Sequence, residues 1–125
     1  MITEQYKNLI RRLIDTTNKG LLKWGTTSLQ GRYEAEIAEY KVTINLVKDD
    51  GAFQIMLPDT EWATLRFVDE TGNVFDKISL YEGKSADYKL LQELYDVARR
   101  SANHIDEKID GIVQGLNKIS GMMPD

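Results

Sequence analysis

The last third of the chain carries an apolar repeat that limits the possible folds more than any other feature. Ten apolar residues follow one another at alternating intervals of three and four, which is the spacing of a heptad seam. They are Tyr88, Leu91, Tyr95, Ala98, Ala102, Ile105, Ile109, Ile112, Leu116 and Ile119. Because this spacing lines one face of an α-helix, the segment is expected to be helical and to need an apolar partner along its length.

The seam changes in width halfway along the segment. Its first half is widened on one flank by Leu90, Leu94 and Val97. In its second half the same flank carries His104, Lys108, Gly111 and Gly115. Since a wide apolar face can cover a sheet and a narrow one suits another helix, the two halves are expected to have different partners.

The segment is either one helix of roughly 50 Å or two shorter helices. Asn103 is a possible N-cap of a second helix, with Asp106 in the supporting third position. We favour a break or bend between Ser101 and His104.

A first helix is predicted from about Glu4 to Lys19. Its apolar residues Tyr6, Leu9, Ile10, Leu13 and Ile14 have helical spacing. Thr3 suits the N-cap, and Gly20 suits the left-handed position that ends many helices. The following Leu21, Leu22 and Trp24 are expected to plug the junction between this helix and a sheet, with "GTTSLQG" as an exposed loop.

From Gly31 onward the apolar period becomes two, which indicates strands with one wet face. Strands are expected at 31–37, 40–46, 52–57, 63–68 and 74–80, separated by short turns such as "KDDG" and "DETGN". Short turns favour an antiparallel meander. The predicted fold is therefore α+β: an N-terminal helix, a five-stranded mainly antiparallel sheet, and a long or broken C-terminal amphipathic helix, with helices covering one sheet face. A single domain is expected over 1–125, with an ordered core from about 3 to 119.

Composition argues against several classes of partner. A net charge of −4 and a pI near 5.0 oppose binding to nucleic acid or to anionic membranes. The chain has no cysteine, and no stretch approaches the roughly 20 apolar residues of a membrane helix. His104 is the single histidine, so a histidine-rich metal site is excluded. We expect a cytoplasmic protein without a metal, cofactor, membrane or nucleic-acid partner.

The order of four landmarks, "NKGLLKW", "GRYEAEI", "DETGNVF" and "LLQELYDVARR", resembles a type of small uncharacterised bacterial α+β protein. The resemblance spans most of the chain. It implies an architecture and a bacterial, cytoplasmic setting. It assigns no activity and no site residues.

"GKS" at Gly83, Lys84 and Ser85 lies between a predicted strand and a predicted helix. A phosphate-binding loop would need a further glycine at the position of Ile78, and it would belong to a parallel sheet. We therefore interpret Ser85 as an N-cap. The helix start with Lys84 remains a weak candidate site for a small anion.

No catalytic residue stands out in the sequence. Glu34 and Glu36 share one strand face at roughly 7 Å, but alternation places such carboxylate pairs on any wet strand. Trp24 and Trp62 are expected at the edge of the core, with a ligand groove as the alternative. The chain is thus more simply interpreted as a binding protein than as an enzyme.

Two functional hypotheses follow. The first is a non-enzymatic interaction module that forms a homodimer through Ile105, Ile109, Ile112, Leu116 and Ile119. Against it stands intramolecular packing of the same seam on Tyr6, Leu9 and Leu13. The second hypothesis is a small-ligand or anion-binding domain that uses Trp24 or Trp62 with Lys84 and Ser85.

Overall fold

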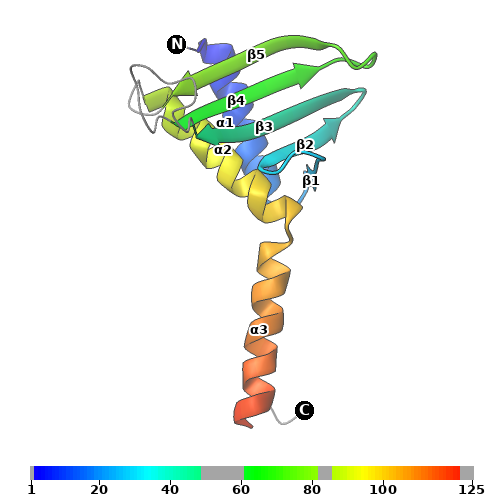
Figure 1. The fold of residues 1–125 in the computed structure, drawn as a ribbon, viewed down its shortest axis with the longest axis vertical. Coiled ribbons are helices and arrows are strands. Elements are labelled where there is room, and N and C mark those ends of the chain that lie inside the picture. The colour runs from blue at the N-terminus through cyan, green and yellow to red at the C-terminus, as the bar shows by residue number, and fades with distance from the viewer. Residues whose placement is uncertain (1, 49–60, 82–85, 122–125) are drawn as a thin grey trace.

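The computed structural model of the protein describes residues 2–48, 61–81 and 86–121. Figure 1 shows a sheet with helices on one side and a final helix that extends away from it. The elements in chain order are α1 (Glu4–Asn18), β1 (Gly25–Thr26), β2 (Arg32–Ile37), β3 (Tyr40–Lys48), β4 (Glu61–Val68), β5 (Val74–Tyr81), α2 (Ala86–Ala102) and α3 (Ile105–Ser120).

The sheet is an antiparallel meander with the strand order β1-β2-β3-β4-β5. Helix α2 crosses all five strands, and α1 packs beside α2 (Figure 1). Helix α3 contacts only α2 within the described residues. The predicted α+β class and antiparallel meander are confirmed, but only the α2 half of the C-terminal seam covers the sheet.

The first helix begins and ends close to the predicted residues. The side chain of Thr3 accepts a hydrogen bond from the Tyr6 amide at 3.3 Å, as an N-cap does. Gly20 has a φ of 75°, which is the left-handed conformation expected after the helix. The local signals of capping and termination were therefore sufficient to define α1.

The described strands differ from the prediction at the first edge of the sheet. The predicted loop "GTTSLQG" contains the short edge strand β1, in which Gly25 pairs with Glu34 and Thr26 with Tyr33. Two residues are too few for periodicity to reveal a strand. The predicted strand at 52–57 lies outside the described residues.

The C-terminal segment is two helices, as favoured from the sequence, but the predicted cap is wrong. His104, not Asn103, precedes α3, in a left-handed conformation with φ 53° and without a side-chain capping bond. Asn103 instead donates from Nδ2 to the hydroxyl of Tyr33 at 3.4 Å. The Arg100 guanidinium forms an ion pair with Asp106 across the break. These contacts turn the chain between α2 and α3.

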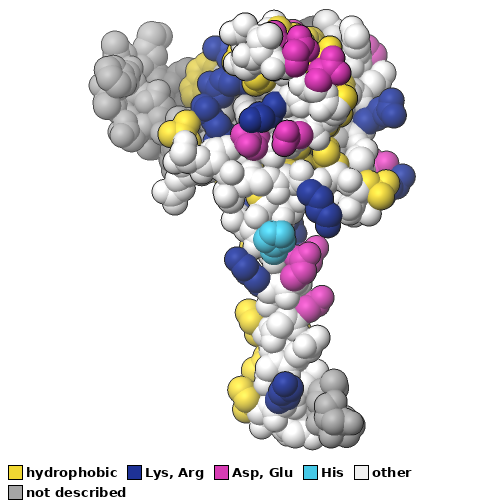
Figure 2. Space-filling view, turned by 90° about the vertical axis from the view of Figure 1, so that its right-hand side faces the viewer, with side chains coloured by type: hydrophobic (Ala, Val, Ile, Leu, Met, Phe, Trp, Pro, Cys, Tyr) yellow, Lys and Arg dark blue, Asp and Glu magenta, His cyan; other side chains and the backbone are white. Residues whose placement is uncertain are grey.

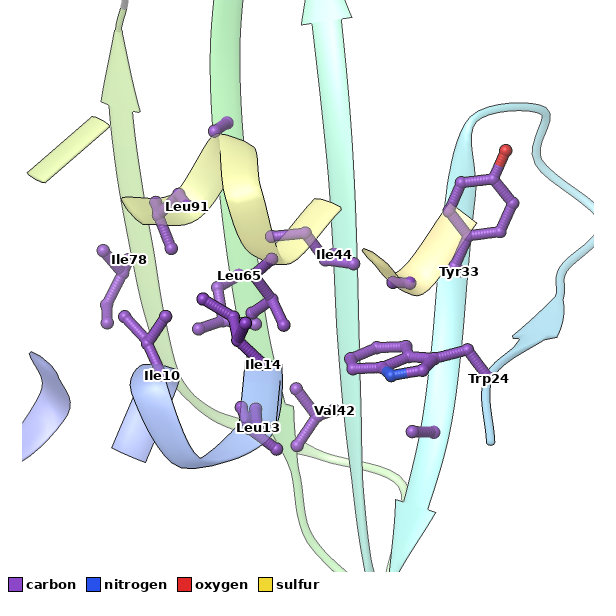
Figure 3. Packing of buried hydrophobic residues seen from close by; sticks show 14 of the residues in the cluster. Ile10, Leu13, Ile14, Trp24, Tyr33, Val42, Ile44, Leu65, Ile78 and Leu91 are labelled. Atoms are coloured by element: carbon purple, nitrogen blue, oxygen red, sulfur yellow. The ribbon is translucent and has the colours of Figure 1, made fainter. Parts of the chain in front are cut away.

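The core lies between the two helices and one face of the sheet. Ile10, Ile44, Leu65, Leu91 and Leu94 are the largest side chains that are fully buried. Figure 3 shows Ile10 and Ile14 of α1 and Leu91 of α2 lying over the sheet beside Leu65 and Ile78. Burial of such side chains stabilises a fold by roughly 1.5–3 kcal/mol each. This shared core fixes the orientation of the sheet and of α2, from whose end α3 departs.

The turn between β4 and β5 is organised by one carboxylate. Asp69 Oδ1 accepts hydrogen bonds from the Thr71 hydroxyl at 2.7 Å, the Thr71 amide at 2.9 Å and the Asn73 amide at 3.0 Å. These bonds, led by that from the Thr71 side chain, lower the pKa of Asp69. The turn therefore prefers the ionised form.

We expect acid to weaken the fold partly through Asp69. Because the pKa of Asp69 is lower in the folded chain than in the unfolded chain, its contribution is present at neutral pH. That contribution is lost as the pH falls below the ordinary aspartate pKa of about 3.9 toward the lowered value. Chemical unfolding across this range should show a shallower acid loss in Asp69→Asn than in the native chain. Equal pH profiles, matching those of the exposed-site control Asp110→Asn, would contradict the assignment.

Candidate functional site

Helix α3 is the element of the described structure that the fold leaves without packing. It spans 16 residues and has no buried residue. In Figure 1 it extends away from the sheet and both other helices, and among the described helices and strands it contacts only α2. The alternative of intramolecular packing on Tyr6, Leu9 and Leu13 is therefore wrong for this structure.

The apolar seam of α3 faces solvent. Ile109 is 50% exposed, Ile112 59%, Leu116 58% and Ile119 84%, whereas Ile105 at the joint is half-buried. Figure 2 shows hydrophobic side chains gathered along one side of this helix. Val113, 49% exposed, adjoins the seam. We call Ile105, Ile109, Ile112, Val113, Leu116 and Ile119 the α3 stripe.

Val113 was missing from the sequence-based interface. A strict alternation of three and four selects a single line of residues and omits the flanking position beside it. A count of all apolar residues within the arc facing the seam would have included Val113. The exposed apolar stripe is thus wider in its middle than the heptad pattern indicated.

Two glycines lie in the middle of the exposed helix. A Cβ atom added at Gly111 or Gly115 would meet nothing within 4 Å. Their lack of side chains is therefore not required by contacts in the described part of the chain. Each costs a helix about 1 kcal/mol relative to alanine. Because neither glycine has a side chain, another helix can approach α3 closely at these two positions.

Charge is distributed unevenly along α3. Asp106 and Glu107 are in the first turn and Lys118 is in the last. This order complements the dipole of the helix itself. It also leaves one end acidic and the other basic, so two such helices have matching charges when they run in opposite directions.

The joint beside α3 contains a small polar cleft of about 160 Å³. Lys23, Arg100, Ser101, His104 and Glu107 are among its lining residues. In Figure 2 the single histidine lies at the base of the projecting helix. The cleft has donors and acceptors but little apolar surface, so it fits the role of a hinge better than that of a pocket for an organic ligand.

Trp24, a candidate ligand residue from the sequence, is part of the core. Its side chain is 5% exposed, and its Nε1 donates to Thr17 Oγ1 at 2.9 Å. Its backbone N–H donates to Ser101 Oγ at 3.0 Å. Trp24 thereby joins α1 to α2 beside the sheet, as the plug at this junction, while Leu21 is 76% exposed and takes no part.

The structure does not bring Trp62, the second aromatic candidate, to Trp24. Trp62 lies on the opposite face of the sheet from the core, and its ring is 5.0 Å from that of Tyr81, centroid to centroid. Lys84 and Ser85 lie outside the described residues. Glu34 carries an ion pair with Lys41 at 3.7 Å, so it is one member of a neutralised surface pair.

The described residues include no group of three or more metal-binding side chains arranged around one point. Among the helices that the structure describes, none combines the length and apolar character needed to cross a bilayer. The feature that remains is the α3 stripe on a rigid base.

The fold and this surface define a two-layer α+β domain that carries a projecting amphipathic helix. No protein-family model, curated protein or solved structure matches the chain.

Proposed function

We propose that the protein is a non-enzymatic interaction module that self-associates through the α3 stripe. The observation that carries the proposal is a 16-residue helix whose apolar seam is exposed and which has no buried residue in the described structure. An isolated helix of this length is marginal in water, and most helical stability in proteins comes from packing of an apolar face. The two glycines lower the stability of a lone α3 further.

A second copy of the chain is the partner that best matches this surface. The intervals from Ile105 to Ile119 are those at which two helices interlock side chains in a coiled coil. Because each copy supplies the same narrow stripe, a dimer with twofold symmetry buries the two stripes against each other. The partner therefore needs no apolar groove larger than the stripe itself.

The charges favour an antiparallel pair. In that arrangement the acidic first turn, with Asp106 and Glu107, is at the same end of the helix pair as the last turn of the other copy, which carries Lys118. The two helix dipoles also oppose each other favourably. Antiparallel pairing places the two α+β domains at opposite ends of the helix pair, where their bulk does not collide.

The direct test is the mass of the native chain in solution across a wide concentration range. Because the stripe covers only two heptads, we expect a dimer of twice 14.3 kDa that dissociates on dilution through the micromolar range. Light scattering coupled to size exclusion measures this mass. A mass of one chain at every concentration up to several hundred micromolar would contradict self-association.

A further inference from the structure

The face of the sheet turned away from the helices carries a cluster of basic side chains at its centre. Arg32 of β2 is opposite Asn45 of β3, and Arg66 of β4 is opposite Thr43 of β3. Lys77 of β5 is opposite Arg66 on its other side. Because cross-strand partners share a sheet face, Arg32 and Arg66 flank the polar pair Thr43 and Asn45, and Lys77 lies one strand further out, beside Arg66. Glu34, which is opposite Thr43 on β2, is the carboxylate next to this pair.

The two arginines of this cluster are not neutralised by carboxylates. Among the described residues, neither Arg32 nor Arg66 has an ion pair, and the neighbouring Glu34 pairs with Lys41. Arg66 Nη1 donates to Asn45 Oδ1 at 2.9 Å, a neutral acceptor. Burial, and then the charge of Arg32, lower the pKa of Arg66, so the two cations destabilise each other.

Two polar atoms of the cluster are buried without a hydrogen-bond partner. They are Nε of Arg32 and Oγ1 of Thr43, within the part of the chain that the structure describes. The Thr43 residue is only 8% exposed. Buried donors and acceptors in native proteins nearly always have partners, so each such atom calls for an explanation. A bound anion would supply acceptors at this position.

We propose that Arg32, Arg66 and Lys77 form a binding site for a phosphate-type oxyanion on the open face of the sheet. A guanidinium presents several donors in a planar fork that matches the oxygens of phosphate, and two forks with one ammonium match a dianion. A turn of the Arg32 side chain presents Nε and an Nη atom to the anion together. The hydrogen bond that Asn45 accepts from Arg66 holds the Arg66 guanidinium in place.

This site is separate from the α3 stripe. Its residues belong to β2, β3, β4 and β5, whereas α2 is the single described element that α3 contacts. Anion binding and self-association are therefore expected to be independent. The ligand is either free phosphate or the phosphate group of an ester, because both present the same oxygens.

The chain offers an internal control for a nuclear magnetic resonance titration with inorganic phosphate. It has six arginines, of which Arg11, Arg12, Arg99 and Arg100 lie on helices outside the cluster. At constant ionic strength, we expect saturable shifts of the Nε–Hε signals of Arg32 and Arg66 and small shifts of the other four. Equal, unsaturated shifts of all six would show general ion screening and overturn the proposal.

Two variants test the same site without relying on the assignment of the arginine resonances. Removal of one charge-assisted partner in Arg66→Gln or Arg32→Gln is expected to raise the dissociation constant for phosphate roughly tenfold. The matched control is Arg12→Gln on the exposed side of α1, which should bind phosphate with the native affinity. Circular dichroism establishes that each variant is folded, and Arg66→Lys, which keeps the charge, replaces any variant that is not. Unchanged affinity in folded cluster variants would overturn the proposal.

Phenyl phosphate, used as a second probe, distinguishes a site for free phosphate from a site for a phosphate ester. Equal affinity for both probes indicates a site for the free oxyanion, whereas tighter binding of the ester indicates a site for organic phosphates. Either result supports the oxyanion site. Absence of saturable binding for both probes contradicts it.

Discussion

Replacing Ile109 and Ile112 together by glutamate is expected to convert the proposed dimer into a folded monomer. Each change puts a charge in the middle of the α3 stripe, where an apolar side chain would otherwise leave water on association. Loss of four such side chains, two from each copy, at about 1.5–3 kcal/mol for each isoleucine, raises the dissociation constant by roughly 10,000-fold or more. Light scattering should then give the mass of one chain at concentrations where the native protein is expected to be dimeric.

The same variant separates an interface from a core. Ile109 and Ile112 are at least half-exposed within one copy, so the α+β domain has no packing to lose. Its thermal unfolding transition should remain cooperative, with lower helicity from α3 alone. If the variant instead unfolds as a whole, the stripe packs inside the copy, and the proposed interface is wrong.

A matched control is available on the opposite side of α3. Gln114→Glu with Lys118→Gln changes the net charge by the same amount as the double isoleucine variant. Both changes lie outside the α3 stripe. This control should remain largely dimeric, with a modest loss from the missing cation at Lys118. Equal dissociation of both variants would show that net charge, and not the stripe, controls association.

Replacing Trp24 by alanine is expected to cost the fold about 3–5 kcal/mol, the range for removal of a large buried aromatic side chain. The indole fills the junction between α1, α2 and the sheet, and its loss also removes the hydrogen bond to Thr17. A domain of this size is typically stable by about 5–15 kcal/mol, so much of the stability disappears. Urea unfolding measures the change.

Two further variants separate the causes of that loss. Trp24→Phe keeps most of the ring but not the N–H, and its cost should approach that of one hydrogen bond together with a small void, about 1–2 kcal/mol. Trp62→Ala removes the other tryptophan from the half-buried open face and its ring contact with Tyr81, and should cost about 1 kcal/mol. A loss in Trp24→Ala no greater than that in Trp62→Ala would show that Trp24 does not hold the junction.

The proposed sites differ in how much the sequence predicted of them. The stripe from Ile105 to Ile119 was evident because helical periodicity is a local property. The basic cluster was not, since Arg32 and Arg66 are 34 positions apart and meet only through pairing with β3. Each arginine alone looks like an ordinary solvated residue in an alternating strand. Only the register of three strands places them side by side.

The sequence by itself determined the α+β class, the limits of α1 and the break before α3. These follow from periodicity, capping residues and turn residues, whose effects extend over a few neighbours. The tertiary structure decided which apolar surfaces are covered. Leu91 and Ile112 belong to the same heptad seam, yet the first is fully buried and the second is 59% exposed.

The reason for that difference is the change of direction at His104. The left-handed residue and the Arg100–Asp106 ion pair turn α3 away from the sheet before its seam can reach the core. The available sheet face is already covered by α2, which contacts all five strands, and by α1, whose Tyr6 ring stacks on Phe67 of β4. Periodicity predicts that a face needs a partner, but the space left by the other elements determines whether that partner lies in the same chain.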